Sequence, residues 1–320
     1  MKLLVYTDGG PTADQALAFA AAWTQALQAE LAVITVRSET HAMEAPPQLG
    51  REIAPADWHR LPQGLQILTD AARKLAAHGV MPPPTDIVIR ETPHSHFFNC
   101  PFTNDRPITF HEHFGPFIES LNREIDRHHF DLLIIAQPRR SRLRRLVLGD
   151  TTRKLALGLH TSVLIVREGT PDSRLVICAD GSASAQRVFP LLQKMLACID
   201  RPVELLWVQS PDVGADERSR VETRIAQVQQ WLTTRGRESH TTRLEGTHPA
   251  ETIAAAAGPD ALVMMGASLR HDVYRQTRGS LPIRLLSCAR ASILLVKAPP
   301  EADPGADAGL TGTKTGWSGR

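Results

Sequence analysis

Short runs of consecutive apolar residues alternate with longer amphipathic stretches along the whole chain. A continuous apolar run of about four to eight residues is typical of a strand that is buried on both faces of a parallel sheet. In the first half the predicted strands are residues 3–6, 31–36, 86–90, 132–136 and 163–166. In the second half they are residues 175–179, 203–208, 241–244, 262–265 and 293–296.

Helices are predicted between these strands. Thr12-Ala-Asp-Gln15 has the capping-box pattern and begins an alanine-rich helix that extends to about Leu27. Residues 62–78 form the next helix, and further helices cover 118–127 and begin at 151. Strands that alternate with helices predict parallel sheets with right-handed crossovers. The predicted fold class is α/β, with two tandem doubly wound, Rossmann-like domains of five strands each.

The two halves repeat one another. Residues 2–8 read Lys-Leu-Leu-Val-Tyr-Thr-Asp and residues 174–180 read Arg-Leu-Val-Ile-Cys-Ala-Asp, and a glycine follows each. Residues 161–167 and 291–297 are a second matching pair. The period is too long for a solenoid, so it indicates two copies of one domain. We expect domains at 1–168 and 173–298 and a disordered, Gly- and Ala-rich tail at 299–320.

The first copy is longer than the second. When the strand ends of the two copies are aligned, the difference in residue number is 172 for Asp8 and Asp180 and again for Val36 and Val208. It falls to 154 for Glu91 and Glu245 and to 130 for Ala136 and Gly266. Extra segments of 18 and 24 residues are therefore predicted after the second and third strands, at the edge where open α/β sheets bind ligands. The predicted insertions, expected to overhang that edge, are residues 38–61 and 92–115.

The strongest chemical motif lies after the fourth strand of the second copy. Gly266-Ala-Ser-Leu269 is followed by Arg278-Gly279-Ser280, which gives the spacing Gly-x2-Leu-x9-Gly-Ser. A glycine at a strand end lets the backbone approach a ribose or phosphate without a Cβ in the way. Gly279 and Ser280 at a helix start offer free N–H groups, a positive dipole end and a hydroxyl, which suit a phosphate. Arginines in this loop add positive charge.

Together with Asp180-Gly181-Ser182 and the closing strands, this motif resembles that of the universal stress protein family, Gly-x2-Gly-x9-Gly-[Ser/Thr]. The resemblance covers both halves and implies a tandem member of the family with ATP as its ligand. It implies that Asp180 and Val208 lie by the adenine and ribose, and Gly266, Gly279 and Ser280 by the ribose and phosphates. Leu269 stands where the family has its second glycine, and its side chain would narrow the phosphate path.

The corresponding motif of the first copy is degenerate. Its aligned residues are Ala136, Arg139, Gly149 and Asp150, so two glycines and the hydroxyl are missing. The Asp150 carboxylate would face an incoming phosphate, and two unit charges about 4 Å apart repel by about 4 kcal/mol at an intermediate dielectric. We predict that the first copy does not bind ATP in the family's way.

Charge and composition limit the remaining classes of function and the cellular location that we expect. With 320 residues, a net charge of +2, no signal-peptide pattern and no apolar run of membrane-spanning length, we expect a cytoplasmic protein without a membrane partner. The four cysteines are scattered and are predicted to be reduced, mostly buried thiols. The basic run at 139–145 is interpreted as a solvated or phosphate-facing loop rather than a nucleic-acid site.

A Phe- and His-rich segment carries a second, weaker chemical pattern. Six of the nine phenylalanines lie between Phe97 and Phe117, and this apolar content should pack on the domain or on a partner. The segment could supply nitrogen and sulfur ligands to zinc or copper, but no standard zinc spacing is present, so we assign no metal ligands. The residues concerned are His94, His96, Cys100, His111 and His113.

The sequence therefore predicts a non-enzymatic stress-response or signalling protein that binds ATP in its C-terminal half. No catalytic residue is assigned, because the chain has no Gly-x-Ser-x-Gly elbow, P-loop or His-Glu-x-x-His. Residues 161–166 and 292–296 would meet in an intramolecular pseudo-dimer, which leaves a further homodimer and an unidentified protein partner open. The alternatives are a nucleotide-independent interaction protein that uses the Phe/His segment, and a slow ATPase.

Overall fold

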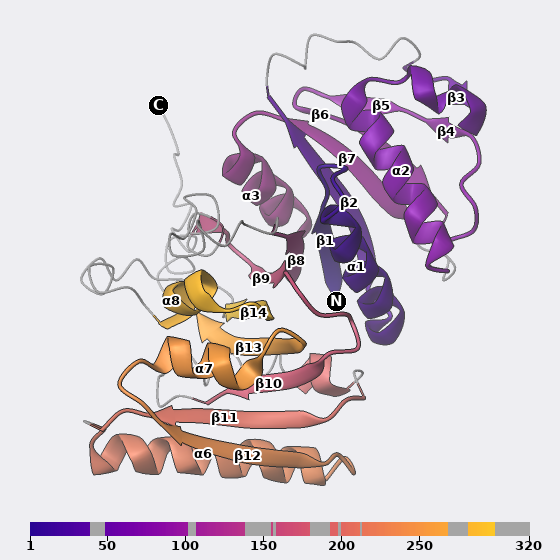
Figure 1. Ribbon diagram of the computed structural model, residues 1–320. Coiled ribbons are helices and arrows are strands. Elements are labelled where there is room, and N and C mark those ends of the chain that lie inside the picture. The colour runs from indigo at the N-terminus through magenta and orange to yellow at the C-terminus, as the bar shows by residue number, and fades with distance from the viewer. Residues whose placement is uncertain are drawn as a thin grey trace, which may run out of the picture.

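A single 12-stranded sheet runs through both halves of the chain (Figure 1). In this computed structural model the described residues are 1–38, 49–101, 107–137, 155, 158–179, 193–197, 200–211, 213–267 and 281–297. Within them the strands of the large sheet follow the order β12-β11-β10-β13-β14-β9-β8-β1-β2-β7-β6-β5, and β3 and β4 form a separate two-stranded sheet.

The N-terminal half contributes strands β1 (Lys2–Tyr6), β2 (Glu30–Arg37), β3 (Glu52–Ile53), β4 (Ile87–Val88), β5 (Arg90–Thr92), β6 (Ser95–Cys100), β7 (Ile108–Phe114), β8 (Leu132–Ala136) and β9 (Ser162–Val166). Its helices are α1 (Ala13–Leu27), the 3-10 helix η2 (Pro55–Arg60), α2 (Gln63–Ala77) and α3 (Phe117–His128). The C-terminal half contributes strands β10 (Arg174–Cys178), β11 (Val203–Gln209), β12 (Ser239–Glu245), β13 (Ala261–Ala267) and β14 (Ser292–Lys297), with helices α6 (Ala215–Thr233), α7 (Pro249–Ala257) and α8 (Leu281–Cys288).

Each half contains five parallel strands in the same order. The sets are β7-β2-β1-β8-β9 and β12-β11-β10-β13-β14, so in both halves the strands run 3-2-1-4-5 in sequence order. This confirms the predicted pair of doubly wound α/β units. The helix expected from Thr12 begins at Ala13, but the Thr12 side chain makes no capping hydrogen bond, so the capping box is not formed.

The third strand of the N-terminal half is not the segment that the sequence pattern predicts. Ile87–Val88 pairs with β3 outside the large sheet, and β7 takes the place beside β2, with Val36 opposite His113. In the other half Val208 lies opposite Leu244, so the offset between the copies falls from 172 at β2 to 131 at β7 and is 130 at β8. Nearly all of the extra length therefore lies between β2 and β7.

The interpretation of residues 92–115 as an overhanging insertion is therefore wrong. This segment contains β6 and β7, which pair antiparallel and extend the sheet beyond β2. The expectation that it packs on the domain is confirmed, since the rings of Phe98 and Phe110 stack at 4.8 Å within the buried core. A strand with His and Glu on its faces does not give the continuous apolar run that marks the other buried strands.

The two halves join through their closing strands, as predicted. β9 and β14 pair antiparallel, with Leu164 opposite Leu294, and every residue of both strands is buried. Matching serines bond across the junction: Ser162 Oγ accepts from the Lys297 N–H and Ser292 Oγ accepts from the Arg167 N–H, each at 3.1 Å. These reciprocal contacts are what a pseudo-two-fold pair requires.

A cation at the end of each closing strand, Arg167 just after β9 and Lys297 as the last residue of β14, also reaches into the other half. The Arg167 guanidinium donates to the carbonyls of Leu286 and Ala289 at the end of α8. The Lys297 ammonium donates to the Leu159 carbonyl at 2.7 Å. Cations suit such unpaired carbonyls at helix ends. Burial lowers the pKa of Lys297 to about 8.

Lys297→Met is expected to change how stability depends on pH. The folded-state pKa of about 8 lies below the value of about 10.4 for an unfolded lysine, so the folded chain binds fewer protons between these values. Below pH 8 the folded state bears the full free-energy penalty for burying the ammonium charge. The penalty is relieved as the pH rises toward about 10.4, so the free energy of unfolding increases by as much as roughly 3 kcal/mol. Urea denaturation at pH 7 and pH 10 should show this gain in the wild type relative to the variant. Parallel pH profiles would contradict it.

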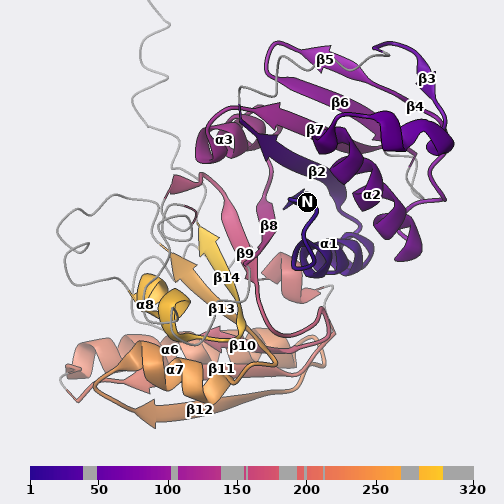
Figure 2. The ribbon, with the colours of Figure 1, turned by 45° about the horizontal axis from the view of Figure 1, so that its top comes forward.

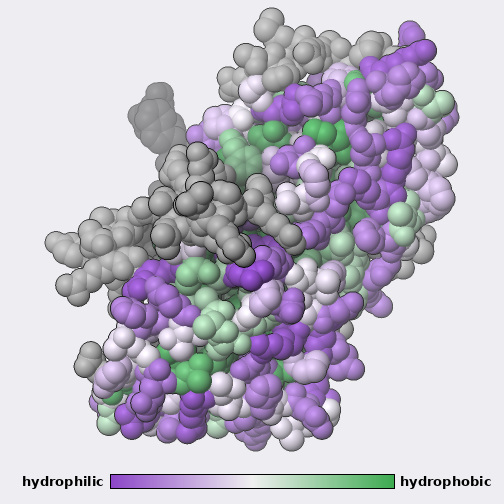
Figure 3. Space-filling view, viewed as in Figure 1, coloured by the Kyte–Doolittle hydropathy of each residue, from purple (hydrophilic) through white to green (hydrophobic). Residues whose placement is uncertain are grey.

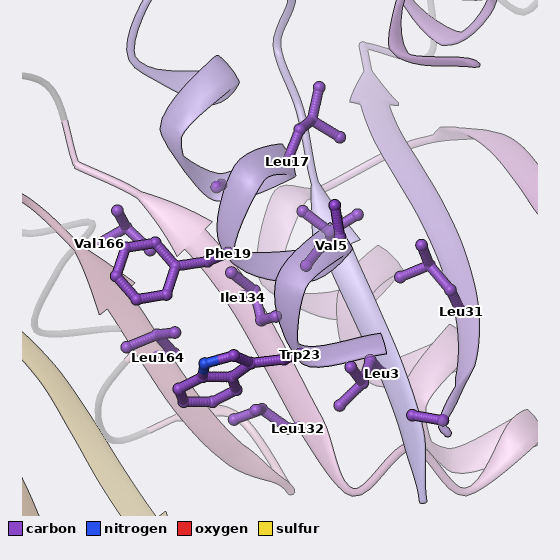
Figure 4. Close-up of a cluster of buried hydrophobic side chains, with 14 of the residues drawn as sticks. Leu3, Val5, Leu17, Phe19, Trp23, Leu31, Leu132, Ile134, Leu164 and Val166 are labelled. Atoms are coloured by element: carbon purple, nitrogen blue, oxygen red, sulfur yellow. The ribbon is translucent and has the colours of Figure 1, made fainter. Parts of the chain in front are cut away.

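Helices cover both faces of the sheet. The apolar side chains buried between helices and sheet form two clusters. In the N-terminal half, α1 places Phe19 and Trp23 over Leu164 and Val166 of β9 (Figure 4). Full burial of one such side chain contributes about 1.5–3 kcal/mol. Apolar residues form only small separate patches on the visible surface (Figure 3). None of the described helices combines the length and apolarity needed to cross a membrane.

Candidate functional site

The predicted nucleotide edge of the C-terminal half is described at two of its five residues. The last paired residues of β10 are Ile177, opposite Met264, and Cys178, opposite Leu206. Val208 lies two positions beyond Leu206 on β11, and Gly266 lies two positions beyond Met264 on β13. The two residues therefore flank the end of β10. Both are partly exposed. Asp180, Gly279, Ser280 and the departing residue Leu269 lie outside the described residues.

The strand order makes this edge a topological switch point. From β10 the chain adds β11 and β12 on one side, and α6, between them, buries Val221 and Ile225 in one core cluster. On the other side it adds β13 and β14 through α7 and α8, whose buried Ile253 and Leu285 belong to the other cluster. Open α/β sheets bind ligands in the crevice at such a point, beyond the carboxyl ends of the strands.

At the matching edge of the N-terminal half, the first strand leads into a tight turn. Asp8, which aligns with Asp180, accepts a hydrogen bond from the Gly10 N–H at 2.8 Å and so forms a turn. Gly9 has φ +76°, and a Cβ on it would lie 2.9 Å from Ile67 Cγ1 of α2. Gly149 and Asp150 lie outside the described residues.

The His residues and Cys100 of the Phe/His segment do not form one site. Successive residues of a strand point to opposite faces. On β7, His111 and His113 face α3, whereas His96 of β6 lies on the α2 face with Glu112, and α2 and α3 lie on opposite sides of β7 (Figure 2). Cys100 shares the face of His96, and His94 is exposed before β6.

Two acidic residues outside the predicted set, Glu112 and Glu124, partner these histidines. His96 Nδ1 lies 3.2 Å from the buried Glu112 carboxylate on the α2 face. On the α3 face His113 Nε2 lies 2.9 Å from Glu124 Oε2, while His111 Nε2 lies 3.6 Å from the other oxygen. Of the two acids, only Glu124 gathers several histidines.

Sequence reasoning missed Glu124 and His128. The two residues are four apart on α3, and His128 Nε2 lies 3.4 Å from Glu124 Oε1. Residues spaced by four share a helix face, and the His-x-His pair at 111 and 113 shares a strand face. These two spacings were the available signals in the sequence. They point to one shared cluster only if residues 108–114 are recognised as a strand that packs against α3.

Burial and charge set the protonation of the α3-facing cluster. Burial lowers the pKa of His111 to about 4, against the opposing effect of Glu124. For Glu124, burial raises the pKa, but the hydrogen bond from His113 and the neighbouring histidines outweigh it, so the pKa is lowered. At neutral pH the cluster therefore presents a carboxylate beside a neutral His111 imidazole.

A cleft of about 420 Å³ adjoins this cluster. Its floor is the uncovered face of β5, β6, β7 and β2, and its wall is the end of α3. His111 and His128 line it, and Phe97 stacks on His111 at a centroid distance of 5.5 Å. Its polar lining includes Lys2, Glu30, Thr92, Ser95, Asn99, Thr109 and Arg127.

The cysteines of the described residues are all free thiols, as predicted. Their burial varies: Cys100 is buried, Cys178 is half-buried and Cys288 is exposed, so the expectation of mostly buried thiols is only partly met. Burial raises the pKa of Cys100 to about 11 and also raises that of Cys288. Neither thiol is therefore activated as a nucleophile.

Residues 103–167 match the sequence model of the universal stress protein family. This part of the chain is similar to universal stress proteins. The match begins before β7 and ends just after β9, so it spans the last three parallel strands of the N-terminal half. This agrees with β7, rather than residues 86–90, being the third strand of that half.

Solved structures extend the universal stress protein likeness to both halves as a likeness of fold. A universal stress protein from Archaeoglobus fulgidus DSM 4304 has 15% identity and a TM-score of 0.62, and the alignment covers 93% of this chain and 97% of that one. A protein of unknown function from Pseudomonas aeruginosa PAO1 has 12% identity and a TM-score of 0.56, with 93% and 92% covered. No curated protein sequence matches the chain significantly.

Proposed function

We propose that this universal stress protein-like chain binds an adenine nucleotide, ATP, at the carboxyl edge of its C-terminal half. The observation that carries the proposal is the position of Val208 and Gly266 on either side of the β10 end, at the switch point of the sheet. The Gly-x2-Leu-x9-Gly-Ser spacing supports it, because Gly279 and Ser280 provide phosphate-binding chemistry after β13.

The N-terminal half has a structural or regulatory role in this proposal. One oxygen of its Asp8 carboxylate accepts a hydrogen bond within the turn, and Ile67 leaves no room for a side chain at Gly9. Nucleotide occupancy of the C-terminal half would order the loop after Gly266 and thereby bias the surface offered to a protein partner. The free thiols suit the reducing cytoplasm, where we place the protein.

Gly266→Val is expected to abolish the response to ATP. Ligand at a hundredfold excess over its Kd stabilises a protein by about 2.7 kcal/mol, so ATP should raise the melting temperature of the wild-type chain. A Val side chain at 266 would occupy the space where the backbone approaches the ribose. Thermal denaturation with and without ATP measures the effect.

Ala136→Val is the matched control. Ala136 ends β8 in the N-terminal half, at the position that aligns with Gly266, and is partly exposed. This variant should keep the full ATP-dependent shift. An unchanged shift in Gly266→Val, or an equal loss in both variants, would contradict the proposed site.

A further inference from the structure

Two histidines and a glutamate converge between β7 and α3. The β7 sequence Ile-Thr-Phe-His-Glu-His-Phe alternates, so His111 and His113 point to the same side of the sheet. On that side α3 buries Leu121 and Ile125 against the sheet, which brings Glu124 over the two imidazoles. One ligand-type atom from each of the three residues lies within 4.8 Å of the others.

We propose that His111, His113 and Glu124 form a binding site for a divalent transition-metal ion, with zinc as the best match. Zinc bonds of about 2.0–2.1 Å to nitrogen and oxygen place the ligand atoms of a tetrahedral site about 3.3 Å apart. His113 Nε2 lies 2.9 Å from Glu124 Oε2, and His111 Nε2 lies 3.6 Å from Oε1 of the same carboxylate. The three ligand atoms lie within 4.8 Å of one another, so the side chains would have to close in toward about 3.3 Å around the ion.

Among the described residues, two buried polar atoms of the cluster have no hydrogen-bond partner, His113 Nδ1 and Glu124 Oε1. The Glu124 side chain is only 2% exposed, and the imidazoles of His128 and His111 approach its Oε1 at 3.4 and 3.6 Å without forming a hydrogen bond. A buried carboxylate is costly unless it is paired or bound to a metal. A divalent cation would coordinate this oxygen and balance the buried negative charge of the carboxylate.

The donor set and the cleft define the kind of ion. Two imidazoles and one carboxylate suit zinc and its neighbours in the first transition series, whereas magnesium and calcium prefer oxygen ligands alone. Cys100 lies on the opposite face of the sheet and supplies no thiolate. His111 opens onto the cleft, which leaves a path for the ion and room for water in a further coordination position.

Zinc titration of the full-length, untagged chain tests the site. Isothermal titration should give one zinc ion per chain, and Glu124→Gln should weaken binding by about 100-fold or more, since even outer-shell partners of zinc contribute 10- to 100-fold. His111→Asn is the second variant, because His111 is only partly buried and its replacement perturbs the core less. His94→Asn, which changes an exposed histidine outside the cluster, should leave the affinity unchanged.

Cobalt substitution gives an independent readout. Co²⁺ bound at this site should show the visible absorption of a four- or five-coordinate ion without a thiolate-to-metal band, because Cys100 lies on the other face of the sheet. The absence of saturable zinc binding in the wild type would overturn the proposal. So would a thiolate band, or a loss of affinity in His94→Asn as large as in Glu124→Gln.

Discussion

Leu294→Asp at the junction of the two halves should destabilise the protein by more than about 4 kcal/mol. Leu294 lies opposite Leu164 in the β9–β14 pair, and both side chains are fully buried. The substitution removes a buried aliphatic chain, which costs about 2–5 kcal/mol for truncation to alanine. It also places an unpaired carboxylate in the core, which adds several kcal/mol unless the group becomes protonated.

Urea denaturation followed by circular dichroism measures this effect. Leu294→Met is the matched control, because a volume-conserving apolar change usually costs less than about 1.5 kcal/mol. The aspartate variant should lose its native baseline or show a much lower midpoint. If both variants unfold at the wild-type midpoint, the junction does not hold the two halves together in the way that the structure shows.

Gly64→Ala should be the most damaging small substitution in the N-terminal half. Gly64 lies in the first turn of α2, and a Cβ there would overlap Glu112 Oε1 and lie 2.5 Å from the carboxyl carbon of that residue. Replacing glycine by alanine in a helix normally stabilises it by about 0.5–1 kcal/mol. Here the overlap dominates, since Glu112 is buried and held by His96, and we expect a net loss of about 1–3 kcal/mol.

A double-mutant cycle identifies the cause of this loss. In the Glu112→Ala background the clash is absent, so adding Gly64→Ala should cost much less than in the wild type, with a coupling energy of about 1 kcal/mol or more. Gly214→Ala is the control, because a Cβ at residue 214 would meet nothing within 4 Å and the φ of this residue is −67°. Additive effects at residues 64 and 112 would contradict the packing described for Glu112.

The parallel strands were predictable wherever local sequence and burial agree. The closing strands 163–166 and 293–296 are continuous apolar runs, and their repetition was enough to predict that they meet. β7 was missed because His111, Glu112 and His113 interrupt its apolar pattern. Those residues are accommodated in the sheet because Glu124 of α3 and His96 of β6, which lie on neighbouring elements, partner them.

The nucleotide edge of the C-terminal half was predictable, whereas the histidine–glutamate cluster between β7 and α3 was not. The resemblance to universal stress proteins predicted Val208 and Gly266 as site residues, and the strand register places both of them at the carboxyl edge of the sheet, beside the β10 end. The histidine–glutamate cluster depends on α3 packing over β7, which no local pattern encodes. The split of the Phe/His segment between two faces follows from strand alternation, once the segment is known to be strand.

The central claim is that one fold was duplicated and that only the C-terminal copy kept its nucleotide site. Isothermal titration of ATP into the full-length chain tests it most directly. We predict one ATP per chain, with binding lost in Asp180→Ala and retained in Asp8→Ala, the aligned residue whose carboxylate is engaged in a turn. Two equivalent sites per chain, or a loss of binding in Asp8→Ala but not in Asp180→Ala, would contradict the account.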